Sequence, residues 1–193
     1  SPEEIAKVIS IDSGVAFCEI AKTKVTLIDT PGYEDFVGQV LSALPVVEGA
    51  VVVVSGDAGV EAGTIKTWKY LDRYNLPRVV CLNKMDKEHA NFEKALESAQ
   101  AELGAKIMPL EIPIGAGDSF KGVIDILKKK AYVYAGEGKF TETDIPAELR
   151  DSADEWLQKL VDFAAETDDS RLEKFLGGGE LSDEELRKGL ADG

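Results

Sequence analysis

The chain has 193 residues, of which 44% are hydrophobic and 30% charged, a composition typical of a globular protein with one sizeable core or two small ones. Its net charge is −14, and residues 141–193 hold 16 acidic and 6 basic side chains, so we expect no direct sequence-specific nucleic-acid binding. No apolar run approaches the roughly 20 residues of a membrane span and no leader-like segment is visible, which predicts no membrane partner and a cytoplasmic location.

The first half of the chain predicts strands that alternate with helices. Residues 8–20 and 25–28 are expected to form an antiparallel hairpin across a tight turn at 21–24. Apolar periodicity then predicts, in chain order, a helix at 34–44, a strand at 50–54 covered on both faces, a helix at 62–71, a strand at 79–82 and a helix at 92–103. This alternation is typical of a doubly wound α/β sheet. Cys18 and Cys81 lie in the apolar runs, which favours buried thiols over a disulfide.

The pattern changes near residue 105. Short β-like runs are expected at 107–114, 122–126 and 131–134, followed by a long amphipathic helix after Pro146 and a shorter helix at 171–176. Ser182 and Glu185 have the spacing of a capping box that opens a last helix. We therefore expect an α/β domain over 1–105 and an α+β subdomain over 106–193. The acidic helices of this second part indicate either a solvated face or a docking surface for a basic protein.

The run Asp29-Thr30-Pro31-Gly32 follows four apolar residues that predict a strand. Ligands of open α/β sheets bind at the carboxyl ends of the strands. There Asp29 can hold a water on Mg²⁺, which keeps several waters when it bridges phosphates. Gly32 has no side chain, so its backbone N–H can approach a γ-phosphate closely. Turns of the form Asp-x-x-Gly are common, so this run alone is weak support for a phosphate site.

The run Asn83-Lys84-Met85-Asp86 also follows a predicted strand. Guanine presents two adjacent donors, and the single carboxylate of Asp86 can accept both, a charge-assisted pairing that adenine cannot offer. Lys84 can lay its methylene stem over the base, and Asn83 can tie neighbouring loops through its amide. The alternative interpretation is a polar strand-to-helix turn with Asp86 as a helix N-cap.

The phosphate-cradling motif Gly-x-x-x-x-Gly-Lys-Ser/Thr does not occur in these 193 residues. The single Gly-Lys pair is Gly138-Lys139, which is followed by Phe140 instead of a hydroxyl residue and lies in a predicted hairpin turn. The sequence therefore predicts a GTPase-like piece without its phosphate loop, which alone binds GTP weakly or not at all.

Several runs resemble one family of translation GTPases. In the first part these are Asp29-Thr30-Pro31-Gly32-Tyr33-Glu34-Asp35-Phe36, Glu48-Gly49-Ala50-Val51-Val52-Val53 and Asn83-Lys84-Met85-Asp86-Lys87; in the second they are Pro109-Leu110-Glu111-Ile112-Pro113-Ile114-Gly115, Phe120-Lys121-Gly122-Val123-Ile124-Asp125 and Glu166-Thr167-Asp168. Together they resemble the GTPase domain of translation elongation factor G, or of a paralogue like it, with the insert that this family carries. Ribosome-protection proteins and class II release factors share the GTPase motifs but are not expected to carry the insert.

The resemblance implies a fold, ligands and site residues. The fold would be a P-loop GTPase-like doubly wound sheet, incomplete because its central phosphate-loop strand is missing, with an α+β insert. Asp29 and Gly32 match the Mg²⁺ and γ-phosphate corner, and Asn83, Lys84 and Asp86 match the guanine corner. The implied ligands are GTP or GDP with Mg²⁺.

Two further positions carry roles by resemblance. Ser10 stands where the family has a threonine that binds Mg²⁺, although it is equally well a plain strand residue. Tyr33 replaces the histidine that usually orients the attacking water, and a neutral phenol with a pKa of about 10 is a poor general base.

The resemblance also implies partners. They are the ribosome at its factor-binding site and the ribosomal stalk protein through the insert. The activity implied for the whole protein is GTP hydrolysis that drives translocation. A non-hydrolysing module that docks the stalk protein remains the alternative. A missing central strand leaves two sheet edges unpaired, so we also expect this piece to self-associate.

Overall fold

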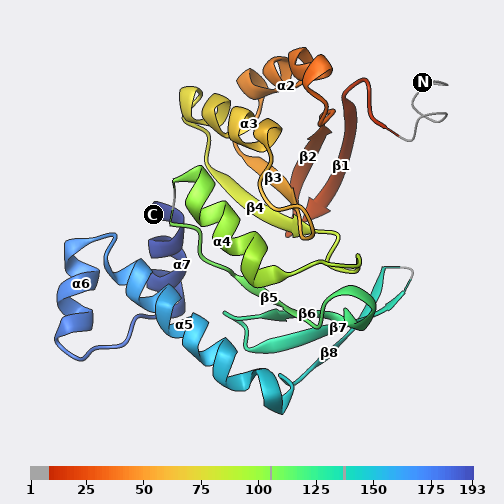
Figure 1. Cartoon of the computed structure of the whole chain (residues 1–193). Coiled ribbons are helices and arrows are strands. Elements are labelled where there is room, and N and C mark those ends of the chain that lie inside the picture. The colour runs from red at the N-terminus through yellow and green to blue at the C-terminus, as the bar shows by residue number, and fades with distance from the viewer. Residues whose placement is uncertain (1–8, 105, 137) are drawn as a thin grey trace. The chain divides into compact units, whose positions relative to one another are not determined.

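The computed structural model describes residues 9–104, 106–136 and 138–193. Its internal contacts divide the chain into two compact units (Figure 1). Unit 1 comprises Ser1–Lys84 and Glu93–Ala105, and unit 2 comprises Met85–Phe92 and Lys106–Gly193. Among the described residues, no helix combines the length and the apolar character that crossing a bilayer requires.

Unit 1 alternates strands and helices, as the sequence predicts. Its elements are β1 (Gly14–Ile20), β2 (Thr23–Asp29), α2 (Val37–Ala43), β3 (Ala50–Ser55), α3 (Ala62–Arg73), β4 (Arg78–Asn83) and α4 (Phe92–Leu103, whose first residue belongs to unit 2). β1 and β2 form the expected antiparallel hairpin, which turns through positive φ angles at Ala21 and Lys22. β1 begins at Gly14 and not at residue 8, so the interpretation of Ser10 as a strand residue is wrong. β3 and β4 pair in parallel, from Ala50 opposite Arg78 to Ser55 opposite Asn83.

The core of unit 1 lies on one face of the β3–β4 pair. Val52 and Val54 are buried there with Leu44 and with Leu71 of α3. The prediction that β3 is covered on both faces is wrong, because Val51 and Val53 point to the opposite face and are 61% and 59% exposed. Packing against helices therefore covers only alternate residues of the strand.

The predicted burial of both cysteines is also wrong. Cys18 and Cys81 are free thiols and exposed. Cys18 lies on β1, all of whose residues are exposed, and Cys81 lies on β4 in register with exposed Val53. In the described part of the chain β2 and β3 are not paired with each other, which agrees with the expected break in the sheet.

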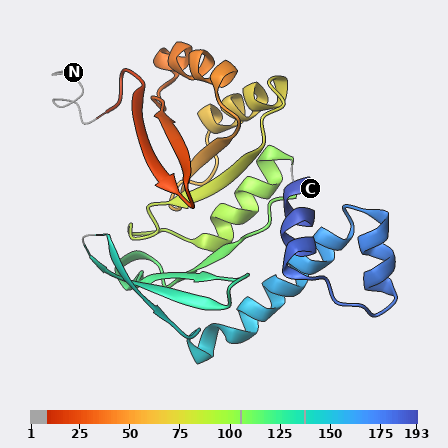
Figure 2. The same ribbon diagram turned by 180° about the vertical axis from the view of Figure 1, so that it is seen from behind.

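Unit 2 packs helices against one four-stranded antiparallel sheet of order β5-β6-β7-β8. Its elements are β5 (Glu111–Ile114), β6 (Gly122–Asp125), β7 (Lys130–Gly136), β8 (Lys139–Thr143), α5 (Arg150–Ala165), α6 (Asp169–Leu176) and α7 (Asp183–Asp192). α5 runs along one face of the sheet in both views (Figure 1, Figure 2). Ile112, Ile124 and Ala131 of the sheet are buried with Ala153 and Leu160 of α5.

The last two helices are fixed by caps that the sequence encodes. The predicted capping box of α7 is present, since Ser182 N donates to Glu185 Oε2 at 2.7 Å and Glu185 N donates to Ser182 Oγ at 3.3 Å. Asp168 caps α6 by accepting from the backbone N–H groups of Ser170 and Arg171. These caps satisfy N–H groups that would otherwise lack partners at the helix starts.

Candidate functional site

Asp29 is the last residue of β2, and its backbone pairs with Gly14 at the open end of the β1–β2 hairpin. Pro31 is buried and turns the chain away from the strand, while Asp29 and Gly32 are exposed. Ser10 is exposed and precedes Gly14 by four residues, so it enters the hairpin from this same open end. The predicted metal-side residues thus lie on connected segments at one end of the hairpin.

Gly32 lies in open space. A Cβ atom added to Gly32 would meet no protein atom within 4 Å, and the Gly32 carbonyl oxygen lies 4.0 Å from where a Cβ of Gly63 would be. Gly63 is in the first turn of α3, so the Asp29–Gly32 turn approaches the start of that helix. Gly32 is therefore exposed with free space around its Cα, which is compatible with the close phosphate approach that the proposed contact requires.

Tyr33 follows this turn with a side chain that is 59% exposed. Its backbone is extended (φ −78°, ψ 139°), and its carbonyl accepts from Phe36 N at 3.0 Å as a short 3-10 helix begins. The next residue, Glu34, forms an exposed ion pair with Lys66 of α3 at 3.5 Å. The backbone around Tyr33 is therefore anchored, while the phenol itself faces solvent.

The carboxyl ends of β3 and β4 meet, as the parallel pairing requires. Gly56 N donates to the Asn83 carbonyl at 2.8 Å, and the Asn83 side-chain Oδ1 accepts from Lys84 N, also at 2.8 Å. The tie between the two loops is thus made by the backbone of Asn83, whereas its amide oxygen shapes the turn into Lys84. Lys84 adopts a left-handed backbone with φ 58°, which a non-glycine residue seldom does.

The loop after β3 contains polar residues that the sequence analysis did not single out. The Ser55 hydroxyl bonds the Asp57 carboxylate, and this bond, more than the smaller effects of backbone N–H groups and the Lys84 charge, lowers the pKa of Asp57. Ser98 Oγ of α4 accepts from Val60 N at 3.1 Å, and a Cβ at Gly59, whose φ is 72°, would lie only 3.0 Å from Ser98 Oγ. In the sequence, the one indication of this polar loop was Asp57, an aspartate just beyond the end of a predicted strand.

The boundary between the units passes through the second motif, between Lys84 and Met85. In unit 2, Met85 is buried and its carbonyl accepts from Gly117 N at 2.8 Å, while Asp86 is exposed. α4 does not begin until Phe92, so the alternative interpretation of Asp86 as a helix N-cap is wrong. Its carboxylate is instead presented from a turn that is anchored by Met85.

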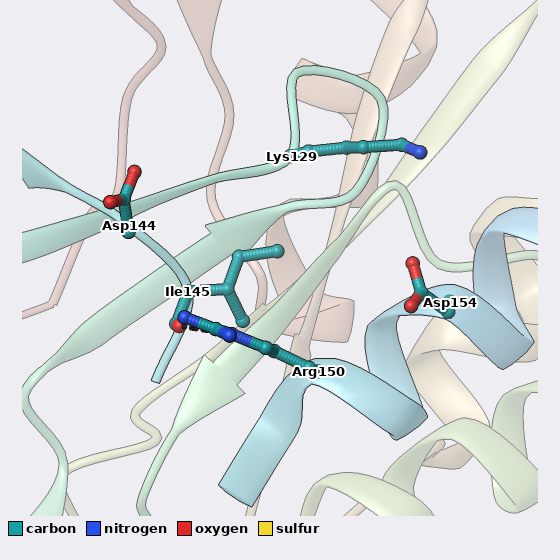
Figure 3. Close-up of a pocket in the computed structure, with 5 residues that line it drawn as sticks. All are labelled: Lys129, Asp144, Ile145, Arg150 and Asp154. Carbon is teal, nitrogen blue, oxygen red and sulfur yellow. Dashed lines mark hydrogen bonds between the residues drawn. The ribbon is translucent and has the colours of Figure 1, made fainter. Parts of the chain in front are cut away.

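A pocket of about 250 Å³ lies in unit 2 (Figure 3). It is lined by Lys129, Asp144, Ile145, Arg150 and Asp154. Arg150 Nε donates to the Ile145 carbonyl at 3.3 Å, and Asp144 pairs with Lys130 at 2.9 Å. Because none of the lining residues belongs to the two motifs, we assign the pocket no part in the candidate site.

No group of three or more His, Cys, Asp or Glu side chains converges on a metal position in the described residues. Ser10 and a water held by Asp29 would supply at most two of the six oxygen ligands that an octahedral Mg²⁺ needs. This donor set fits an ion whose other ligands are phosphates and water, and does not fit a metal held by protein groups alone.

Comparisons with known proteins agree with this fold. Residues 1–175 match the family model described as the elongation factor Tu GTP binding domain. The fold is also similar to a crystal structure of a protein from Thermus thermophilus, with a TM-score of 0.89 and 36% sequence identity. That alignment covers 98% of this chain and 28% of the other, so the present chain spans a little over a quarter of that protein.

Proposed function

Because this chain belongs to the family of elongation factor Tu GTP-binding domains, we propose that it is the guanine-reading part of a translation elongation factor of the G type. One observation carries the proposal: Asn83-Lys84-Met85-Asp86 leaves the carboxyl end of β4, where a hydrogen-bonded turn presents Asp86 to solvent. The motif runs between Pro109 and Asp168 favour the G type over other members, because they resemble its insert. The same insert argues against a ribosome-protection protein or a release factor.

In the whole protein, we expect this region to take part in binding and hydrolysing GTP on the ribosome, with translocation as the outcome. Asp86 would accept the two guanine donors, Lys84 would cover the base, and Gly32 N would contact the γ-phosphate. Asp29, through a water, and Ser10 would complete the shell of a Mg²⁺ ion that bridges the phosphates. Catalysis would then consist mostly of positioning and charge stabilisation.

The test of base recognition is Asp86→Asn in the full-length protein that carries this chain. An amide can donate to the 2-carbonyl of xanthine but cannot accept both guanine donors, so GDP affinity should fall by about 100-fold or more while xanthosine diphosphate gains. Asp57→Asn, an exposed carboxylate in the loop after β3, is the matched control and should keep the preference for guanine. Unchanged GDP affinity in Asp86→Asn would refute the assignment.

A separate test concerns Tyr33, which stands where the family usually has a histidine. Tyr33→His in the full-length protein should change ribosome-stimulated GTP turnover, because imidazole can orient and deprotonate water far better than a phenol. Tyr33→Phe separates the hydroxyl from the ring. If both variants turn over GTP like the natural protein, Tyr33 has no part in the hydrolytic step.

For the 193-residue chain alone we propose weak or undetectable GTP binding, because its sequence contains no phosphate-cradling motif. Isothermal calorimetry should give no saturable signal at micromolar chain and nucleotide. A micromolar or tighter dissociation constant would refute this expectation.

We also propose that the unpaired edges of β2 and β3 promote self-association, which sedimentation over a concentration series would detect as a rising mass.

A second candidate is favoured by the charge of the helices. Residues 141–193 carry a net charge of −10, which suits docking of a basic protein such as a ribosomal stalk component. In this alternative the chain is a non-hydrolysing interaction module. Stalk-protein binding that survives in a full-length variant lacking nucleotide affinity would support it, whereas binding that requires GTP would favour the GTPase.

A further inference from the structure

The hydroxyl of Ser98, on α4, holds the loop of residues 56–61 that joins β3 to α3. Ser98 Oγ accepts from the backbone N–H of Val60 at 3.1 Å, and both residues are partly buried. The approach is close, since a Cβ atom at Gly59 would lie 3.0 Å from Ser98 Oγ and 3.2 Å from Ser98 Cβ. The loop and Ser98 both belong to unit 1. A side chain of α4 thus fastens the β3–α3 loop.

The same loop also contacts the turn that opens the second motif. Gly59 N donates to the Ser55 carbonyl at 2.8 Å, and Gly56 N donates to the Asn83 carbonyl, also at 2.8 Å. Gly56 and Gly59 are buried, so a backbone N–H there is costly to leave without an acceptor. These two anchors join backbone to backbone. The anchor made by Ser98 is the one of the three that a substitution can remove.

One peptide group receives two contacts at this turn. The Asn83 carbonyl, which accepts from Gly56, and the Lys84 N–H, which donates to Asn83 Oδ1 at 2.8 Å, belong to the same planar peptide. Lys84 follows with a φ of 58°. A non-glycine residue keeps such a backbone only where its surroundings hold it. A shift of the loop at Gly56 would therefore tilt this peptide and turn the Lys84 side chain.

We propose that Ser98 is a positioning residue for guanine-nucleotide binding. By fastening the β3–α3 loop to α4, its hydroxyl keeps Gly56 on the Asn83 carbonyl and so keeps Lys84 in the conformation that covers the base. Ser98 acts through the backbone of the loop and not by contact with the nucleotide. The inference rests on the proposed function, because it adds a residue to the same guanine site. A methylene stem covers any purine, so the effect should not depend on the base.

The first test uses the 193-residue chain without nucleotide. Ser98→Ala removes the acceptor of the Val60 N–H and should loosen the loop. The amide hydrogens of Gly56 and Lys84 should then exchange with solvent about tenfold faster, as expected when roughly one hydrogen bond is lost from a local opening. NMR hydrogen exchange follows each amide separately. The amide of Leu71, which is buried in α3, should exchange as in the natural chain.

The second test uses the full-length protein that carries this chain. Ser98→Ala should weaken GDP binding by about three- to tenfold. It should raise KM for GTP by a similar factor and leave kcat unchanged, because it removes binding common to substrate and transition state. Inosine diphosphate, which lacks the 2-amino group of guanine, should be weakened equally, because Lys84 shifts and Asp86 does not. Ser98→Thr keeps the hydroxyl and should restore both amide exchange and affinity.

The matched control is another helical serine of unit 1. Ser42 Oγ, on α2, donates to the Gly38 carbonyl of its own helix at 2.8 Å. Ser42→Ala therefore also removes a hydroxyl and a hydrogen bond but leaves the β3–α3 loop fastened. This variant should match the natural protein in amide exchange, GDP affinity and KM.

Three results would overturn the proposal. Natural exchange rates at Gly56 and Lys84 in Ser98→Ala would show that the loop does not depend on the hydroxyl. A lower unfolding temperature with unchanged GDP affinity and KM would leave Ser98 a purely structural role. A changed preference for guanine over hypoxanthine would mean that the variant disturbs Asp86 instead of Lys84.

Failure of the proposed function would have a different signature. If the natural full-length protein does not bind GDP, the guanine site fails, and the role of Ser98 in binding fails with it. The exchange rates of the 193-residue chain would still decide whether Ser98 holds the loop.

Discussion

The two units differ in how completely their sheets are covered. In unit 2 the sheet and α5 close one core in which Ile124 and Leu160 are fully buried and Ile126 is 1% exposed. In unit 1 the β3–β4 pair is covered on one face, and Val51, Val53 and Val79 on the other face are all more than half exposed. The β1–β2 hairpin also exposes Phe17.

This difference shows that Asp29–Gly32, Asn83 and Lys84 lie on the less self-sufficient part of the chain, whereas Met85 and Asp86 belong to unit 2. Parallel strands are normally buried on both faces, and an apolar face left in water forfeits about 25 cal/mol for each Å² that burial would remove. We therefore expect unit 2 to be the more stable unit and unit 1 to gain stability from anything that covers its open face. The two tryptophans allow this to be measured, because Trp68 belongs to unit 1 and Trp156 to unit 2.

The largest expected effect is in the unit 2 core. Leu160→Ala removes a fully buried side chain and should lower the free energy of unfolding of unit 2 by about 2–5 kcal/mol. In a Trp68→Phe background, urea unfolding followed by Trp156 fluorescence should show the loss. Leu176→Ala, at a residue of the same unit that is 76% exposed, should change little. If Leu160→Ala in a Trp156→Phe background shifts the transition reported by Trp68 equally, the two units unfold as one.

A second pair of variants tests the open face of unit 1 within one strand. Val54 is 1% exposed and Val53 is 59% exposed. Val54→Ala should destabilise unit 1 by about 2 kcal/mol, because it removes buried methyl groups and leaves a gap. Val53→Thr should change stability by less than about 0.5 kcal/mol, as surface changes usually do. A large loss in Val53→Thr, read from Trp68 in a Trp156→Phe background, would mean that the open face is covered in solution.

A third test concerns the buried guanidinium that ties α6 to α7. Arg171 is 7% exposed and donates through Nη2 to Asp192 at 2.8 Å and to Thr167 Oγ1 at 2.9 Å, while its Nε is buried without a hydrogen-bond partner. Asp192→Ala removes only the acceptor and should destabilise unit 2 by about 1–2 kcal/mol. The loss is smaller than for a fully buried ion pair, because Asp192 is partly exposed. Arg171→Met, which removes the buried charge itself, should be less harmful. In thermal unfolding, Arg171→Met should therefore be more stable than Asp192→Ala. A lower unfolding temperature for Arg171→Met would contradict this account.

Apolar periodicity explains which elements could be predicted. The α4 bounds, Phe92–Leu103, match the sequence prediction because Ala95, Leu96, Ala99 and Leu103 form a buried stripe at helical spacing. β8 was missed, because every residue of Lys139–Thr143 is exposed and the strand is held by backbone pairing to β7. An edge strand of this kind has no alternation of apolar and polar residues to reveal it.

The candidate site divides in the same way. Asp29, Gly32, Asn83 and Asp86 could be proposed from the sequence because each lies in a contiguous run at or directly after the end of an apolar strand, and β2 and β4 do end at Asp29 and Asn83. Two hydrogen bonds near these runs could not be predicted, because they depend on which strand ends and helices meet in space. They join Ser55 to Asp57 and Val60 to Ser98. The exposure of Val53 could not be predicted either, because a continuous run of valines shows no periodicity that would tell a strand covered on one face from a strand covered on both.

The smallest expected effect is electrostatic and belongs to the capping box of α7. Bonds from Lys174 first, and then from the backbone and hydroxyl of Ser182, lower the pKa of Glu185 to about 2. Because the folded-state pKa lies below the unfolded value of about 4.3, the stabilisation is complete above about pH 4.3 and is lost as the pH falls toward 2. Glu185→Gln keeps much of the shape without the charge, so the variant should be slightly less stable at pH 7 and equal to the natural chain near pH 2.

Glu184, which neighbours Glu185 and has no such role in the capping box, supplies the control Glu184→Gln. NMR titration of the Glu185 carboxyl measures the pKa directly, and a value near 4.3 would show that the box is open in solution and that this end of unit 2 is less firmly closed than its core.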